Sequence, residues 1–99
     1  MFSEELAYKI DLIARSEIET YGLPTIRHYS LSLEKGKELA KRLNADVNLV
    51  SAGIALMDIK LGQAAKEGKQ IQHVQYCVDY ARKILHLNYS RRSMFEPVR

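Results

Sequence analysis

Apolar residues recur at helical spacing along most of this 99-residue chain. In residues 3–21 they form a stripe near the 3.6-residue period of an α-helix, made up of Leu6, Ile10, Ile13 and Ile18. Ser3 is a suitable N-cap, and Gly22 followed by Pro24 is a stop signal. The pattern therefore predicts a first helix over residues 3–21.

A second helix is predicted from Thr25, which can act as its N-cap, to about Leu43. Its expected inner face consists of Ile26, Tyr29, Leu33, Gly36, Leu39, Ala40 and Leu43. Gly36 lowers helix stability relative to alanine. We therefore expect Gly36 to permit close packing against a neighbouring helix.

The third predicted helix, VNLVSAGIALMDI, is apolar on almost every side. It follows a short turn, Asn44-Ala45-Asp46, whose Asp46 can cap it. A helix that is hydrophobic all round is buried. We expect it to be the central helix of the domain.

Residues 60–70 contain two glycines, three lysines and two glutamines, which predicts a loop with a helical turn around Ala64. A fourth helix is predicted from about Ile71 to Leu87, with a stripe formed by Val74, Cys77, Val78, Ala81, Ile84 and Leu85. We expect residues 88–90 to close this helix and the tail RRSMFEPVR to start another helical turn. No segment alternates with period two. The predicted fold is all-α, a single domain over residues 1–99 with four to five helices packed around the third.

Composition and cysteine usage narrow the class of protein. No apolar run approaches the roughly 20 residues that span a bilayer. The start MFSEELAYK has early acids and no apolar signal core. A single cysteine, Cys77, excludes an internal disulfide and fits a reducing compartment. We expect a cytoplasmic protein with no membrane partner.

The net charge of +3 is unevenly spread, with five acids and two bases in residues 1–22 and seven acids and thirteen bases in residues 23–99. A basic segment can favour a phosphate-bearing ligand or nucleic acid. Here, however, the bases stand beside acids at helical spacing, as in Glu34-Lys35 and Lys37-Glu38, which is typical of a solvated face. The pattern argues against a nucleic-acid partner.

Three residues at predicted helix ends could carry chemistry: His28, Asp58 and His73. A histidine in the first turn of a helix is discouraged from taking a proton, and the neutral imidazole is the form that binds metals. Asp58, at a helix C-terminus, faces the negative end of the dipole, so a cation beside it would be favourable. Other roles stay open, since each histidine can be a surface or capping residue and Asp58 can pair with Lys60 or accept backbone hydrogen bonds.

The remaining candidates are weaker. Lys60, Lys66 and Lys69 could contact a substrate phosphate, although a polar loop needs lysines for solubility in any case. Cys77 lies among apolar residues and is expected in the core, and His86 suits a helix C-terminus structurally. No phosphate-binding loop, nucleophile elbow, HExxH pair or CxxC motif is present.

The order of these residues resembles that of HD-domain proteins, the metal-dependent phosphohydrolase superfamily, over about residues 20–90. IRHYSLSLEKGKELAKRLNADVNLVSAGIALMDIKLG is similar to the family segment in which a histidine opens one helix and a buried helix ends in a His-Asp pair. IQHVQYCVDYARKIL is similar to the segment that carries a later histidine. The resemblance implies that His28 and Asp58 are ligands of a divalent metal (Mn, Mg, Fe, Ni or Zn), that His73 is a further metal ligand or a phosphate contact, and that Asp58 is catalytic.

Two departures from the family pattern affect this expectation. The histidine of the His-Asp pair is replaced by Met57, whose thioether is a poor ligand for the cations this chemistry uses. Family members also continue with further helices and a late aspartate ligand, whereas this sequence ends at Arg99. We therefore expect a minimal or truncated HD-like domain.

Two functions follow from the resemblance. The first is a divergent HD-type phosphohydrolase acting on a small phosphorylated compound or nucleotide. The alternative is a non-catalytic HD-like module that acts in binding or oligomerisation. We expect a homo-oligomer, with a dimer the simplest case, because helices that missing elements would cover must bury their apolar faces elsewhere.

Overall fold

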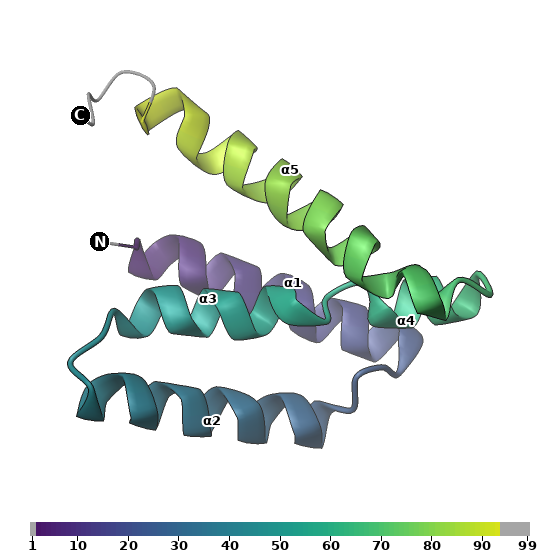
Figure 1. The fold of residues 1–99 in the computed structure, drawn as a ribbon, viewed down its shortest axis with the longest axis horizontal. Coiled ribbons are helices and arrows are strands. Elements are labelled where there is room, and N and C mark those ends of the chain that lie inside the picture. Colours follow the sequence, from purple (N-terminus) through teal and green to yellow (C-terminus); the bar gives the residue numbers. More distant parts are fainter. Residues whose placement is uncertain (1, 94–99) are drawn as a thin grey trace.

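The chain is all-α in its computed structural model, which describes residues 2–93 and the side chains of all of these except 70 and 87–93. The elements are α1 (Glu4–Tyr21), α2 (Ile26–Arg42), α3 (Val47–Met57), α4 (Leu61–Lys66), the 3-10 turn η1 (Gln70–Gln72) and α5 (His73–Ser93). Figure 1 shows α1 and α2 on either side of α3, whereas α5 leaves the bundle at an angle. No helix of the described part combines the length and apolar character needed to cross a membrane.

The first three helices begin where the sequence places their caps. The Ser3 hydroxyl accepts a hydrogen bond from the Leu6 N–H, and the Thr25 hydroxyl accepts one from the His28 N–H. Asp46 Oδ1 accepts from the Leu49 N–H. Each cap satisfies a backbone donor that has no partner within its helix. Gly22 ends α1 with φ 79°, a left-handed conformation that glycine adopts at little cost, and its N–H donates to the Ile18 carbonyl.

The core is a cluster of buried side chains contributed by α1, α2, α3 and the start of α5. Ile10 is fully buried, and Ile18, Tyr29, Leu33, Ala52, Ala55 and Cys77 pack around it. The third helix is central, as predicted, because it packs against both α1 and α2. Gly36 also has the predicted role, since a Cβ on this residue of α2 would collide with Cδ1 of Ile54 on α3. The missing side chain lets the two helices approach.

The predicted burial is wrong for parts of two helices. Leu39 and Leu43 of α2 are 53% and 69% exposed, and Ile26 is also exposed. We expected α3 to be buried on almost every side, but one side of it is accessible. Its residues Leu49 and Met57 are more than half exposed. Periodicity finds the apolar positions of a helix, but an apolar face is buried only where another element covers it.

The C-terminal part differs from the prediction in three ways. Residues 61–66 form a short helix, α4, where the sequence predicted a loop with one turn near Ala64. The next long helix begins at His73 rather than Ile71, and it continues through residues 88–90, which were expected to close it, as far as Ser93. Val74 and Val78 are exposed although they belong to its predicted inner stripe, whereas Cys77 is buried as expected. The expected extra turn in the tail falls partly on residues 94–99, which lie outside the described residues.

Candidate functional site at the end of α3

Asp58 lies where α3 ends and the chain turns toward α4. It is the C-cap residue of α3, and its side chain is partly buried. Its Oδ1 is 3.5 Å from Nε2 of His73, the first residue of α5, and each side chain keeps a little under a third of its surface exposed. The sequence pattern therefore located two residues that the fold brings together although they are 15 positions apart.

His28 belongs to the same region through a small cavity between α1, α2 and α3. The third residue of α2, it is exposed and lines the cavity together with Asp58, Tyr29, Ser32 and Met57. The cavity offers about 10 Å³ to the centre of a water molecule, which is roughly what one water needs. A small ion or a water fits such a space, but a phosphorylated substrate must stay outside it.

Asp58 thus connects the two histidines, one by direct contact and one through the shared cavity. The donor types, two imidazole nitrogens and one carboxylate, suit borderline divalent cations. In residues 2–93, however, no three His, Cys, Asp or Glu side chains lie close enough together to hold a metal ion as they stand. Metal ligation by His28, Asp58 and His73 therefore stays a prediction, and it requires at least one of these side chains to move.

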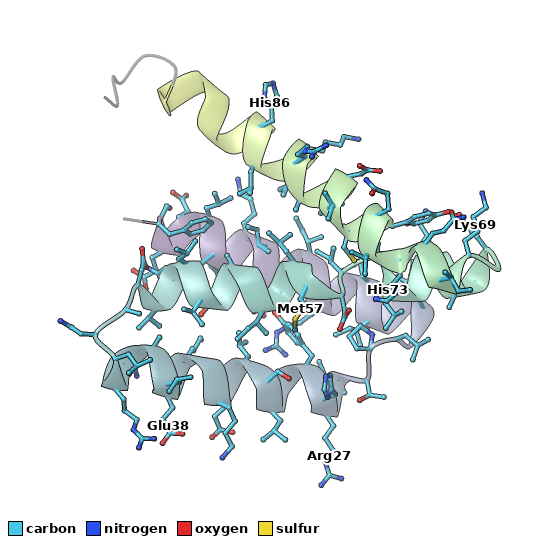
Figure 2. All side chains as sticks on the ribbon, viewed as in Figure 1. Arg27, Glu38, Met57, Lys69, His73 and His86 are labelled. Atoms are coloured by element: carbon cyan, nitrogen blue, oxygen red, sulfur yellow. The ribbon has the colours of Figure 1, made fainter. Side chains whose placement is uncertain are left out.

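Met57 stands directly before Asp58, where the resemblance described above leads us to expect a histidine. It lines the cavity beside Asp58 and is 57% exposed. Figure 2 shows its side chain at the gap between α3 and α2. The side chain of Met57 is therefore accessible and lies next to Asp58.

The three loop lysines lie in different surroundings. Lys60 Nζ is 3.3 Å from Glu17 Oε2 and 4.5 Å from the ring centroid of Tyr80. Lys66 Nζ lies 5.9 Å from the ring centroid of Tyr21, and Lys69 is exposed at the turn after α4, as Figure 2 shows. A phosphate contact by these lysines stays a prediction, and the Lys60 ammonium already has two partners inside the fold.

Cys77 and His86 lie on the same helix in opposite environments. Burial raises the pKa of the Cys77 thiol, and the Asp58 charge raises it further. The Cys77 sulfur accepts a hydrogen bond from the Lys60 N–H at 3.3 Å, which ties the turn after Asp58 to α5. His86 is exposed and points away from the bundle in Figure 2, so it is a natural control for the two histidines near Asp58.

Two residues near the site were not singled out from the sequence. Ser32 follows His28 by one helical turn and lines the same cavity, so the i, i+4 spacing could have identified it. Glu17, the partner of Lys60, is 43 positions away in the sequence and has no local signal. Comparison with protein-family models, curated proteins and solved structures finds no match to this chain.

Proposed function

We propose that this protein is a divergent HD-type metal-dependent phosphohydrolase that acts on a small phosphorylated compound or nucleotide. One observation carries the proposal: Asp58 Oδ1 lies 3.5 Å from His73 Nε2, and Asp58 lines a small cavity together with His28. The resemblance of the sequence to HD-domain proteins supports the same assignment.

A divalent cation in this region would be held by Asp58, His73 and His28. When bound, it supplies the positive charge that activates water for attack on phosphorus and stabilises the developing negative charge. The contact with His73 limits the positions that the Asp58 carboxylate can take. His28 is the exposed member of the three, so its imidazole is the one most free to move toward Asp58.

The substrate would approach from outside the small cavity. Exposed side chains of His28 and Met57 border it, and the space inside accommodates no more than a water-sized particle. Among the loop lysines, Lys66 and Lys69 are exposed, whereas Lys60 is held by Glu17. Lys66 and Lys69 are therefore freer than Lys60 to contact a phosphate.

Metal uptake and hydrolysis test the proposal separately. The protein would be dialysed against Mn²⁺, its retained metal measured, and its hydrolysis of p-nitrophenyl phosphate followed. We expect Asp58→Ala and His28→Ala to lose both the metal and the activity, and His86→Ala, a histidine outside the site, to retain them. A wild-type protein that retains no Mn²⁺ and hydrolyses nothing would overturn the proposal.

A second candidate function is a non-catalytic HD-like module that acts in binding or oligomerisation. It is favoured by the methionine at the ligand position and by the exposed apolar residues of α2 and α3. Retention of metal without hydrolysis, or an assembly without either, would support this candidate. Its test is the mass of the protein in solution.

A further inference from the structure

A polar groove lies between α1 and α2, with the start of α3 as its floor. Its volume is about 320 Å³, at the lower end of the roughly 300–1,000 Å³ of small-molecule sites. The groove is at the end of the bundle where α1 and α3 begin and α2 ends, as Figure 1 shows. None of the described residues lines both this groove and the cavity beside Asp58, so the two sites are separate.

The two walls of the groove carry opposite charges. Glu4 and Asp11 stand two turns apart on one face of α1, and Lys37 and Lys41 stand one turn apart on one face of α2. Among the described residues, these four are the charged ones that line the groove. No ion pair of the described part of the chain joins one wall to the other. Carboxylates and ammonium groups therefore lie on opposite sides of a space that can receive a molecule.

The two lysines are not used for ion pairs along α2. Glu34 precedes Lys37 by three residues, and Glu38 precedes Lys41 by the same distance, a spacing at which side chains on a helix are neighbours. Neither lysine forms an ion pair within residues 2–93, and both line the groove, whereas the two glutamates do not. Both ammonium groups are therefore available to a ligand.

The acidic wall has one carboxylate that is still available. Asp11 already has two partners, because both of its carboxylate oxygens lie 3.1 Å from Nε of Arg15 and its Oδ1 accepts a hydrogen bond from the Tyr29 hydroxyl at 2.5 Å. Glu4 is exposed and forms no ion pair in the part of the chain that the structure describes. A cationic group in the groove would therefore be placed beside Glu4.

The floor and lower walls combine polar and apolar side chains. Ser51 is buried and Asn48 is half-buried, so hydroxyl and amide groups lie at the bottom of the groove. Ala7 and Leu33 are buried beside them and supply apolar surface. A ligand that fits this floor has an uncharged middle part with both a hydrogen-bonding group and a small apolar group.

We infer that the groove binds a small zwitterion of the dipeptide class, with its carboxylate at Lys37 and Lys41 and its ammonium group beside Glu4. A ligand with negative charge alone, such as phosphate, would be attracted by the lysines but repelled by the acidic wall. A free amino acid carries both charges on one carbon atom, whereas a dipeptide carries them on two and can extend between the walls. The inference does not depend on the functions proposed above.

NMR titration with glycyl-leucine tests the class of ligand. Two matched probes each lack one charge: N-acetylglycyl-leucine has no ammonium group, and glycyl-leucinamide has no carboxylate. We expect saturable binding of glycyl-leucine at millimolar concentration and an affinity at least tenfold lower for each blocked probe, because each loses a charge-assisted contact. Inorganic phosphate should bind no better than the blocked probes. A wild type that does not bind glycyl-leucine, or that binds a blocked probe or phosphate equally well, overturns the inference.

Substitutions on the two walls test the position of the ligand. We expect Lys41→Gln and Glu4→Gln each to weaken glycyl-leucine binding at least tenfold. The matched controls are Lys35→Gln and Glu5→Gln, because these exposed residues lie on the same helices and do not line the groove. Both controls should bind as the wild type does. Dipeptide binding that survives both wall substitutions overturns the assignment of the groove, and circular dichroism confirms that each variant remains helical.

Discussion

Lys60 and Glu17 form an ion pair that connects the turn after Asp58 to α1. The Lys60 Nζ and Glu17 Oε2 atoms are 3.3 Å apart, and the side chains are only 17% and 21% exposed. The ring of Tyr80 on α5 lies under the ammonium group. The other carboxylate oxygen of Glu17 is buried without a hydrogen-bond partner in the structure. The turn after Asp58 is thus joined to α1 by a charge pair that is mostly removed from water.

We predict that Lys60→Met destabilises the protein by about 1–3 kcal/mol, because it leaves the Glu17 carboxylate buried and without its counter-charge. The double variant Lys60→Met with Glu17→Gln should recover at least part of this loss, since the unpaired charge is then removed. Urea unfolding followed by circular dichroism measures all three proteins. A double variant less stable than Lys60→Met alone would contradict the explanation.

The sequence was a good guide to helices and their caps because these depend on neighbouring residues. Each of the three N-caps accepts a hydrogen bond from the backbone N–H three residues later; these caps are Ser3, Thr25 and Asp46. Such a short separation can be recognised in the sequence. It was harder to predict which face of each helix is covered by neighbouring helices. Leu39 and Leu49 lie on apolar stripes like those of the core residues, and only the arrangement of the helices leaves them exposed.

The candidate site was predictable in part for the same reason. The helix ends that carry His28, Asp58 and His73 could be located from the sequence, and the fold places Asp58 beside His73. Distances among side chains from three helices depend on packing, which no local pattern specifies. The partner of Lys60 could not be predicted either, because Glu17 is separated from it by two helices.

The N-terminus is held by Asp46, and this contact should make stability depend on acid pH. The Phe2 N–H donates to Asp46 Oδ2 at 2.8 Å, and this bond and the one from Leu49 lower the pKa of the carboxyl below its ordinary value of 3.8. Because folding lowers this pKa, the contribution is present above pH 3.8 and is lost as the pH falls through the folded-state value.

We therefore predict that Asp46→Ala lowers the thermal midpoint at neutral pH and that its difference from the wild type shrinks below about pH 4. Thermal unfolding over a pH series measures this difference. Asp79→Ala, at an exposed position on α5, is the control. A difference that stays constant down to pH 2 would show that the charge of Asp46 is not what holds the N-terminus.

Gly62 of α4 allows the close packing of α4 against the end of α1. A Cβ at this position would collide with the Cβ of Tyr21 and would lie 3.0 Å from the Leu23 carbonyl oxygen. We predict that Gly62→Ala costs about 1–3 kcal/mol, because backbone-linked atoms cannot move aside. Gly36→Ala should cost less, since it meets only the flexible end of Ile54.

Gly53→Ala is the matched control for both glycine substitutions. With no atom near its Cβ, it should stabilise the protein by about 0.5–1 kcal/mol through helix propensity. Urea unfolding followed by circular dichroism gives the three values. A loss of stability in Gly53→Ala under these conditions would mean that α3 is covered by another part of the chain.

The last prediction concerns Met57, which stands where the family pattern has a histidine. Its side chain lines the cavity beside Asp58 and His28 and is more than half exposed, so a histidine can be accommodated there without disturbing the core. A third imidazole next to Asp58 would add a nitrogen donor to a site that has no ready group of three ligands within residues 2–93. We predict that Met57→His raises the affinity for Mn²⁺ or Zn²⁺ at least tenfold, as measured by isothermal titration calorimetry.

Two variants separate metal ligation from unspecific effects of that substitution. Met57→Leu keeps an apolar side chain of similar volume and should leave metal affinity unchanged. Adding Asp58→Ala to Met57→His should abolish the gain, because the new imidazole then has no carboxylate to share a cation with. If Met57→His binds metal no better than the wild type, residue 57 does not face the ion, and the likeness of ALMDIKLG to a His-Asp metal pair is one of sequence alone.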